Sequence, residues 1–303
     1  MAANTFQNAT RIARTAIGTL DLELVLGSTV WRSADAEFTG GTGYTVNVRV
    51  PAKLTASEYG DAFAEHADPL AAAAVTERVV AVTLDTMPYH LAPLTDEDVT
   101  LNIDTFESRV LVPQATAVAE KVETILATAM DSATYATTLN MDESDPWATI
   151  VAARKALNAK KVPQRDRFLA VGTDIEADIL GDPDLLRRVD ASGQDGTLRE
   201  GVIGRLGGFA VVPTAALPAD TAIAYHRSAF ILATRAPVVP QGASAGAGLS
   251  QNGYGLRWIR DYDPDYAQDR SFVSTFCGTA VVQDPNPSSL GLVRAVKITT
   301  SGS

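Results

Sequence analysis

The chain has 303 residues, enough for a substantial core, and it is acidic, with 36 acidic against 25 basic residues and a formal net charge of -11. Affinity for phosphates comes from clustered Lys and Arg, so this balance argues against a chain whose main task is to grip nucleic acid. The single cysteine, Cys277, excludes an intramolecular disulfide framework and a zinc site built on several thiolates. No apolar run approaches the roughly 18 to 20 residues that cross a bilayer, so we expect no membrane segment and a protein made in a cytoplasm.

The N-terminal region predicts an amphipathic helical arm. Its apolar residues recur at helical spacing: Ile12, Ala16, Ile17, Leu20 and Leu24. They place one apolar stripe on a helix of about four turns. Arg11 and Arg14 make the first twenty residues basic. Such a helix either packs on its own domain or reaches a neighbouring subunit, and the pattern leaves both alternatives open.

Two stretches of alternating apolar residues predict a long β-hairpin. The residues on one face of each strand are Val46, Val48 and Val50 in the first, and Val80, Val82 and Leu84 in the second. About two dozen polar and alanine-rich residues between the strands predict an elaborate tip. Because this arm has too few large apolar residues for a core of its own, we expect it to rest on another chain.

The strongest helical pattern runs from Phe106 to Ala129, after a turn-like stretch at 93–98. Its apolar side comprises Leu111, Ala115, Val118, Val122, Ile125, Leu126 and Ala129, and its polar side comprises Glu107, Glu120, Lys121 and Glu123. Pro113 lies inside the pattern, so the helix either begins near this residue or is kinked there.

Helices and strands alternate through the middle of the chain, which predicts a mixed α/β region. The predicted helices span 146–157, capped by Asp145, and 173–180, capped by Thr173 and Asp174; the predicted strands span 167–172, 206–214 and 222–225. Residues 240–255, rich in Gly, Ala and Ser, predict a loop. Strands at 256–262, 272–282 and 292–298 close the chain, and the whole predicts an α+β fold.

The sequence contains partial matches to catalytic and metal-binding motifs, but the neighbouring residues that each motif requires are missing. Residues 242–246 fit G-x-S-x-G around Ser244, but neither a helical pattern nor a histidine follows. Asp261, Asp263 and Asp265 share the odd spacing of a calcium loop, but the sixth and twelfth loop positions lack the required Gly and Glu, so we predict a solvated acidic turn. The three histidines lie far apart, and no glycine cluster fits a phosphate-binding motif. The sequence predicts no enzyme, no cofactor and no metal.

Three stretches carry a resemblance to a known family. They are FTGGTGYTVNVRVP before the hairpin, LTDEDVTLNIDTFESRVLVPQATAVAEKVETILA into the long helix, and RFLAVGTDIEADIL followed by GVIGRLGGFAVVPTAALP and AYHRSAFILATRAP. In this order, the chain resembles the major capsid protein of tailed double-stranded DNA bacteriophages, which has the Hong Kong 97-type fold. The resemblance spans about Ala9 to Ile298, and the subtype is similar to short-tailed-phage coat proteins and their actinobacterial-phage relatives.

The resemblance implies a division of the chain into five parts. They are an N-arm at 1–42, an extended hairpin called the E-loop at 43–93, a P-domain with a spine helix at 94–145, an A-domain at 146–254, and closing P-domain strands at 255–303. The implied function is self-assembly, through hexamers and pentamers, into an icosahedral shell that encloses phage double-stranded DNA without sequence-specific binding. Implied partners are a portal protein, a separate scaffolding protein and, as an option, a decoration protein. The implied location is the virion capsid, assembled in the host bacterial cytoplasm.

Six residues are candidate contacts between subunits: Arg11, Arg14, Arg49, Lys53, Glu77 and Arg78. No charged helical extension precedes the arm, so we expect no cleavage of this subunit, and we expect no inserted domain in the A-domain. Lys53 and Asn286 are of the residue types that form an isopeptide cross-link in some relatives, but a lone lysine in the hairpin favours non-covalent contacts. An encapsulin-type nanocompartment is the alternative function, and a soluble α/β hydrolase that uses Ser244 ranks third.

Overall fold

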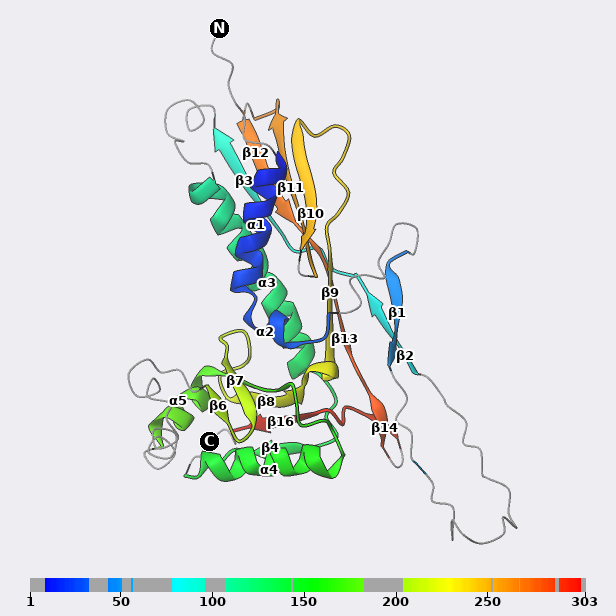
Figure 1. Ribbon diagram of the computed structural model, residues 1–303. Helices are drawn as coiled ribbons and strands as arrows, with labels where there is room; N and C mark the ends of the chain where they lie inside the picture. The colour runs from blue at the N-terminus through cyan, green and yellow to red at the C-terminus, as the bar shows by residue number, and fades with distance from the viewer. Residues whose placement is uncertain are drawn as a thin grey trace, which may run out of the picture.

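The computed structural model describes residues 9–32, 43–50, 56, 78–95, 107–142, 144–182, 204–251, 253–266, 268–286 and 289–300. A long body built around one helix joins a smaller body at one end, and a β-hairpin lies to the side of both (Figure 1). None of the helices in these ranges is long and apolar enough to cross a membrane.

The long body is a four-stranded antiparallel sheet packed against two helices. Its strands, in spatial order, are β10 (Ala245–Gln251), β11 (Tyr254–Asp263), β12 (Gln268–Ser274) and β3 (Tyr89–Thr95). The helices are α1 (Ala9–Glu23) and α3 (Val112–Asp131), and the short α2 (Val25–Thr29) follows α1 (Figure 1). One apolar cluster fills the space between helices and sheet.

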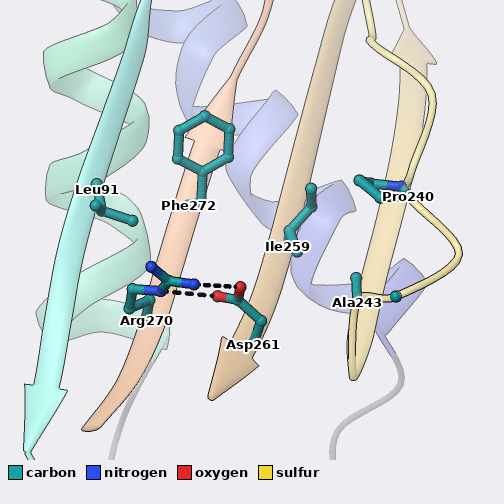
Figure 2. Close-up of a pocket in the computed structure, with 8 residues that line it drawn as sticks. Leu91, Pro240, Ala243, Ile259, Asp261, Arg270 and Phe272 are labelled. Atoms are coloured by element: carbon teal, nitrogen blue, oxygen red, sulfur yellow. Dashed lines mark hydrogen bonds and ion pairs between the residues drawn. The ribbon is translucent and has the colours of Figure 1, made fainter. Parts of the chain in front are cut away.

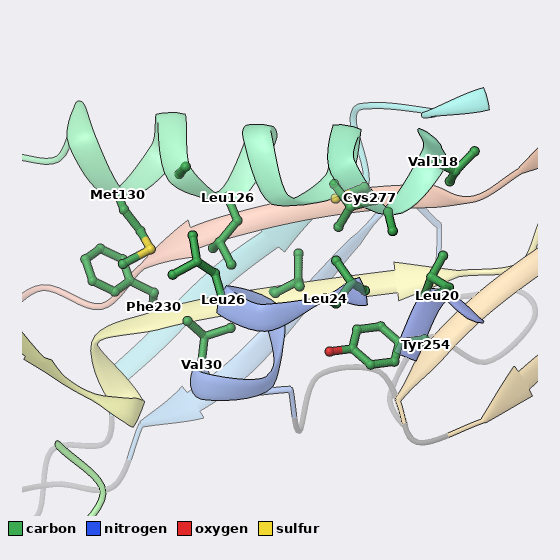
Figure 3. Packing of buried hydrophobic residues seen from close by; sticks show 14 of the residues in the cluster. Leu20, Leu24, Leu26, Val30, Val118, Leu126, Met130, Phe230, Tyr254 and Cys277 are labelled. Atoms are coloured by element: carbon green, nitrogen blue, oxygen red, sulfur yellow. The ribbon is translucent and has the colours of Figure 1, made fainter. Parts of the chain in front are cut away.

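The apolar stripe predicted for the N-terminal arm is confirmed. Its members Ile12, Ala16, Ile17, Leu20 and Leu24 are all buried. They share one cluster with Val118 and Leu126 of α3 and with Tyr254 of β11 (Figure 3). Of the two alternatives left open by the sequence, α1 therefore takes the first and packs on its own chain.

The long helix is also confirmed, with one error. Leu111, Ala115, Val118, Val122 and Leu126 are buried, and Pro113 lies in the first turn of α3, where a missing N–H costs nothing. A five-residue π-helical turn, Glu107–Leu111, precedes it. The prediction that Glu123 lies on the polar side is wrong, because this carboxylate is buried.

The smaller body is a six-stranded sheet covered by two helices on one face. Its strands, in spatial order, are β4 (Thr138–Asn140), β16 (Ala295–Thr299), β8 (Thr221–His226), β5 (Arg167–Val171), β7 (Phe209–Pro213) and β6 (Arg205–Leu206). α4 (Pro146–Ala159) and α5 (Thr173–Gly181) cover one face, and the end of α3 packs on the other. Burial on both faces explains why β5 and β8 are apolar without alternation.

The predicted caps of the two covering helices fare differently. The Asp145 carboxylate accepts a hydrogen bond of 3.0 Å from the Ala148 N–H, which confirms it as the cap of α4. The cap of α5 is Gly172, one residue before the predicted pair Thr173 and Asp174. Glycine is required there, since a Cβ would lie 2.2 Å from the Pro218 carbonyl oxygen.

Four predictions about strands are corrected. The predicted strand at 206–214 is the hairpin of β6 and β7, joined by Gly207 and Gly208 at φ of 58° and 89°, as a tight two-residue turn requires. The predicted loop at 240–255 contains β10, and the predicted turn at 93–98 begins inside β3. Pro93 is tolerated there because β3 is an edge strand. The predicted strand at 272–282 is divided into β12 and β13 (Phe276–Val281).

Four further strands were not predicted: β4, described above, and three others. β9 (Phe230–Arg235) pairs with β13 as a two-stranded ribbon that runs along the molecule, and β14 (Asp284–Asn286) pairs with β15 (Ser289–Gly291) (Figure 1). A short 3-10 turn, Arg227–Ala229, leads into β9.

Removing Leu126 from the centre of this packing should be costly. We expect Leu126→Ala to lower the free energy of unfolding by about 2–5 kcal/mol, because the fully buried side chain leaves a cavity. Lys121→Ala, an exposed position on the same helix, should change it by less than about 0.5 kcal/mol. Urea denaturation of the unassembled subunit measures both, and equal effects would contradict the central role of this face.

Candidate assembly surfaces

The root of the hairpin packs on its own chain. β1 (Thr45–Val50) and β2 (Arg78–Thr83) pair antiparallel as predicted. Their buried residues form a cluster with the β9–β13 ribbon: Val46, Val48, Val50, Val82 and Leu84 with Ile231, Ala233 and Val282. The root therefore buries its apolar face on its own chain, and contact of the arm with another chain stays a prediction. The tip of the hairpin, apart from Ala56, lies outside the described residues.

The chain leaving β2 crosses β13 at very short range. A Cβ on Gly278 would lie 2.2 Å from the Thr83 carbonyl oxygen, so only glycine fits this position. Next to it, Thr86 and Cys277 exchange two backbone hydrogen bonds, with N to O distances of 3.2 and 2.9 Å. Backbone contact at this crossing thus fixes the direction in which the hairpin leaves the body.

The opposite face of the hairpin is open to contact. Tyr44 is 76% exposed and Val79 is 56% exposed, and Val79 lies directly across the ladder from Arg49, which is also exposed. Exposed apolar and aromatic side chains beside an arginine are the composition found in protein interfaces. This face is available to another copy of the chain.

The six predicted contact residues do not gather in one place. Arg14 is exposed on α1, and Arg49 is exposed on β1. The Arg78 guanidinium donates a hydrogen bond to the Gln283 carbonyl oxygen of the same chain. Lys53, Glu77 and the side chain of Arg11 lie outside the described residues. All six remain predicted contacts.

Glu123 holds the end of the N-terminal arm on the long helix. Its two carboxylate oxygens accept hydrogen bonds from the N–H groups of Leu26 and Gly27, at 3.1 and 3.0 Å. These N–H groups belong to the first turn of α2, where the helix itself offers no acceptor. Burial raises the pKa of Glu123, and the two backbone hydrogen bonds oppose that rise. No side-chain pattern indicates this pair of hydrogen bonds, termed the Glu123 clamp, since both N–H donors belong to the backbone.

The sheet of the long body has a hollow on its outer face, lined by Leu91, Ile259 and Phe272 from three neighbouring strands and by the segment from Pro240 to Ala243 (Figure 2). At one end, Arg270 donates to the carboxylates of Asp261 and Asp263 at 2.7 and 2.9 Å. The lining residues comprise apolar side chains, glycine and an ion pair. A mostly apolar surface of this kind suits contact with a partner.

The two rejected chemical motifs have clear local structures. Ser244 is exposed immediately before β10, a strand, whereas a nucleophile elbow requires a helix after the serine. The prediction of a solvated acidic turn is wrong for Asp263, which is buried and paired with Arg270. Across the described ranges, no group of three or more His, Cys, Asp or Glu side chains is placed to hold a metal ion.

The Glu123 clamp generates a stability prediction. Glu123→Ala leaves two buried N–H groups without acceptors and should lower the free energy of unfolding by about 2–3 kcal/mol at neutral pH. Glu123→Gln should cost less, because the amide oxygen still accepts.

The pH dependence provides a second readout of the clamp. The folded pKa lies above the ordinary value of 4.5, so the contribution of this group is complete below that pH and is lost as pH rises through the raised pKa. The Gln variant should lack this decline. Urea denaturation at a series of pH values tests it, and parallel curves for wild type and Glu123→Gln would contradict it.

Comparison with known proteins gives the family. The sequence model of the family described as "Phage capsid protein" matches residues 90–286. Similar solved structures include one from Mycobacterium phage Che8, with 21% identity, 92% of each chain covered and a TM-score of 0.64. The capsid of cyanophage P-SCSP1u has 13% identity, covers 88% of this chain and 86% of its own, and has a TM-score of 0.62.

The same fold extends further. A virus-like particle from Pyrococcus furiosus has 9% identity, covers 95% of this chain and 98% of its own, and has a TM-score of 0.55. No curated protein sequence matches the chain. At these identities the structures establish the α+β fold of phage capsid subunits, and the family match extends from β3 to β14. The chain belongs to the phage capsid protein family and is a major capsid protein, a subunit that forms the phage shell.

Proposed function

We propose that this subunit assembles through hexamers and pentamers into a closed icosahedral shell around a phage double-stranded DNA genome, and that it carries out no catalysis. The family match over 90–286 carries the proposal. The net charge of -11 supports a container wall that leaves packaged DNA free to move without sequence-specific binding. Assembly would take place in the host cytoplasm and the product would be the virion capsid.

Shell formation requires each subunit to offer several contact surfaces. The outer face of the hairpin and the hollow on the outer face of the sheet supply two of them. Each contact is modest, but symmetry repeats it in every copy, so a closed shell gains stability from many weak interfaces. We infer that the predicted contacts at Arg11, Arg14, Arg49, Lys53, Glu77 and Arg78 contribute to these interfaces.

We propose the five-part division of N-arm, E-loop, P-domain, A-domain and closing strands with two adjusted boundaries. β3 and β10 are hydrogen-bonded into the sheet of β11 and β12, so both strands are better grouped with the P-domain. Most of the six-stranded body then corresponds to the A-domain, and the P-domain segments contribute its strands β4 and β16. A portal protein, a separate scaffolding protein and, as an option, a decoration protein are the proposed partners.

The encapsulin-type nanocompartment remains the alternative, since a virus-like particle from Pyrococcus furiosus shares the fold. The family match favours the phage shell. The cargo separates the two functions, because a phage shell receives DNA through a portal and a nanocompartment encloses protein.

Electron microscopy of the purified protein, alone and with a co-expressed scaffolding protein, tests the proposal. We expect uniform polyhedral shells or rings of subunits. A dispersed ~32 kDa monomer under both conditions would contradict shell formation. Shells that copurify with a host protein in fixed ratio would support the nanocompartment instead.

Gly278 offers a sharper test of how hairpin direction affects assembly. We expect Gly278→Ala to force β2 away from β13 and to reduce the yield of shells of wild-type size, while the circular dichroism spectrum stays that of a folded subunit. Gly18→Ala on α1 is the matched control, because nothing lies within 4 Å of its added Cβ. Wild-type shells from the Gly278 variant would show that the crossing does not set the assembly geometry.

A further inference from the structure

The charges of the six-stranded body are separated between its two ends. β4, β5 and β16 run in the same direction, and β8 runs against them. The segments that leave β4 and β5, and the segment that enters β8, therefore meet at one end of the sheet. The segment that enters β5 and the turn between β6 and β7 lie at the other end.

The first end, termed the acidic end, carries seven carboxylates: Asp142, Asp145, Asp174, Glu176, Asp178, Asp182 and Asp220. Backbone hydrogen bonds of 3.0 Å from the Asp174 N–H to the Ala219 carbonyl oxygen, and of 2.9 Å from Gly172 to Thr221, confirm that α5 and the start of β8 meet there. The segments 141–147, 172–182, 214–221 and 299–300 that form this end contain no Lys or Arg. Among the described residues of this end, the charged side chains are therefore all acidic.

The second end, termed the basic end, carries a group of exposed cations that includes Arg154, Lys160, Lys161, Arg165 and Arg205. Asp166 is the acid among them. Arg154 donates a 3.0 Å hydrogen bond to the Gly207 carbonyl oxygen, which places the end of α4 beside the β6–β7 turn. The net charge of the whole chain is -11, so the overall composition does not reveal this local group of cations.

The basic end is held in a defined shape. Arg167 is buried, and its guanidinium donates hydrogen bonds of 2.6 and 2.7 Å to the carbonyl oxygens of Val162 and Pro163. These bonds fix the turn that presents Lys161 and Arg165 to solvent. In the described part of the chain, neither of these two side chains makes an ion pair. Lys161 and Arg165 are therefore positioned to form ion pairs with another molecule.

The two ends cannot neutralise each other within one molecule. The five residues of β5 separate them by about 16 Å at ~3.3 Å per residue, which exceeds the ~8 Å distance over which exposed charges act at physiological salt. In a heterologous contact, one surface of each copy meets a different surface of the next copy, and the series can close into a ring. Such a contact needs two complementary patches at different places on one chain, and the two charged ends meet this need.

We propose that the basic end of one copy contacts the acidic end of a neighbouring copy within the shell. The inference rests on the proposed function, since it needs copies of the chain side by side. A second copy fits better than DNA as the occupant, because DNA would engage the basic end and leave the opposite acidic end without a role. The contact is electrostatic, so ring or shell formation should weaken as salt concentration rises.

Charge reversal tests the contact. Lys161→Glu with Arg165→Glu should reduce the yield of shells at least about tenfold, because the lost attraction is repeated in every copy. Lys161 has a φ of 54°, but a lysine-to-glutamate change leaves the Cβ and hence the backbone strain unchanged. Arg109→Glu in the π-helical turn with Lys121→Glu on α3 applies the same charge change to exposed positions away from both ends and should leave the yield unchanged.

The reciprocal variant makes the test specific. Asp174→Lys with Asp178→Lys should also assemble poorly alone, whereas mixing it with the Lys161→Glu, Arg165→Glu protein should restore mixed rings or shells. Thermal melting checks that each subunit is folded. Failure of wild type to form shells would overturn the proposed function. Normal shells from the basic-end variant would overturn this contact alone, and normal shells that no longer retain DNA would assign the basic end to DNA.

Discussion

The structure depends on the burial of α3 along its whole length. One helix of 20 residues contacts α1 and α2, the four-stranded sheet, the β9–β13 ribbon and one face of the six-stranded sheet. Its buried apolar residues belong to one cluster that also contains residues of the four-stranded sheet and of one face of the six-stranded sheet, and Figure 3 shows part of this cluster. The subunit is elongated (Figure 1), and an elongated chain cannot gather its apolar side chains at one centre. A long central helix solves this problem because every other element needs to reach only the nearest part of it.

Polar contacts along α3 fix the register in which its apolar face packs on the other elements. The Gln114 amide donates to the Ser271 carbonyl oxygen and accepts from the Ser271 hydroxyl, which in turn accepts from the Trp258 indole. Glu123 clamps α2, and at the end of α3 the Lys297 ammonium bonds the Asp131 carboxylate at 2.7 Å. Apolar faces alone would tolerate sliding of the helix by a turn, whereas these pairs are satisfied in one register. They therefore fix the relative positions of sheet, arm and six-stranded body.

Local periodicity predicted much of this fold, and tertiary constraints account for what it missed. The stripes of α1, α3 and α4 and the alternation of β1 were legible because each face repeats over several residues. β10 was mistaken for a loop because it is rich in glycine. At Gly246 the folded chain leaves no room for a larger residue, since a Cβ there would lie 2.8 Å from the Val239 side chain. Glu123 was misplaced because its partners are backbone N–H groups, and the two charged ends were missed because they appear only when the strand directions are known.

The apolar faces that are already buried within the subunit determine which surfaces remain for assembly. The root of the hairpin and the N-terminal arm satisfy their apolar faces within the subunit, so folding need not wait for neighbours. The outer hairpin face and the two charged ends are the surfaces that we propose for contact between copies. Interfaces built from exposed, partly charged surfaces are weak individually and salt-sensitive, which allows wrongly placed subunits to dissociate before the shell closes. A subunit that folds first on apolar packing and assembles second on polar contacts keeps these two steps from competing for the same side chains.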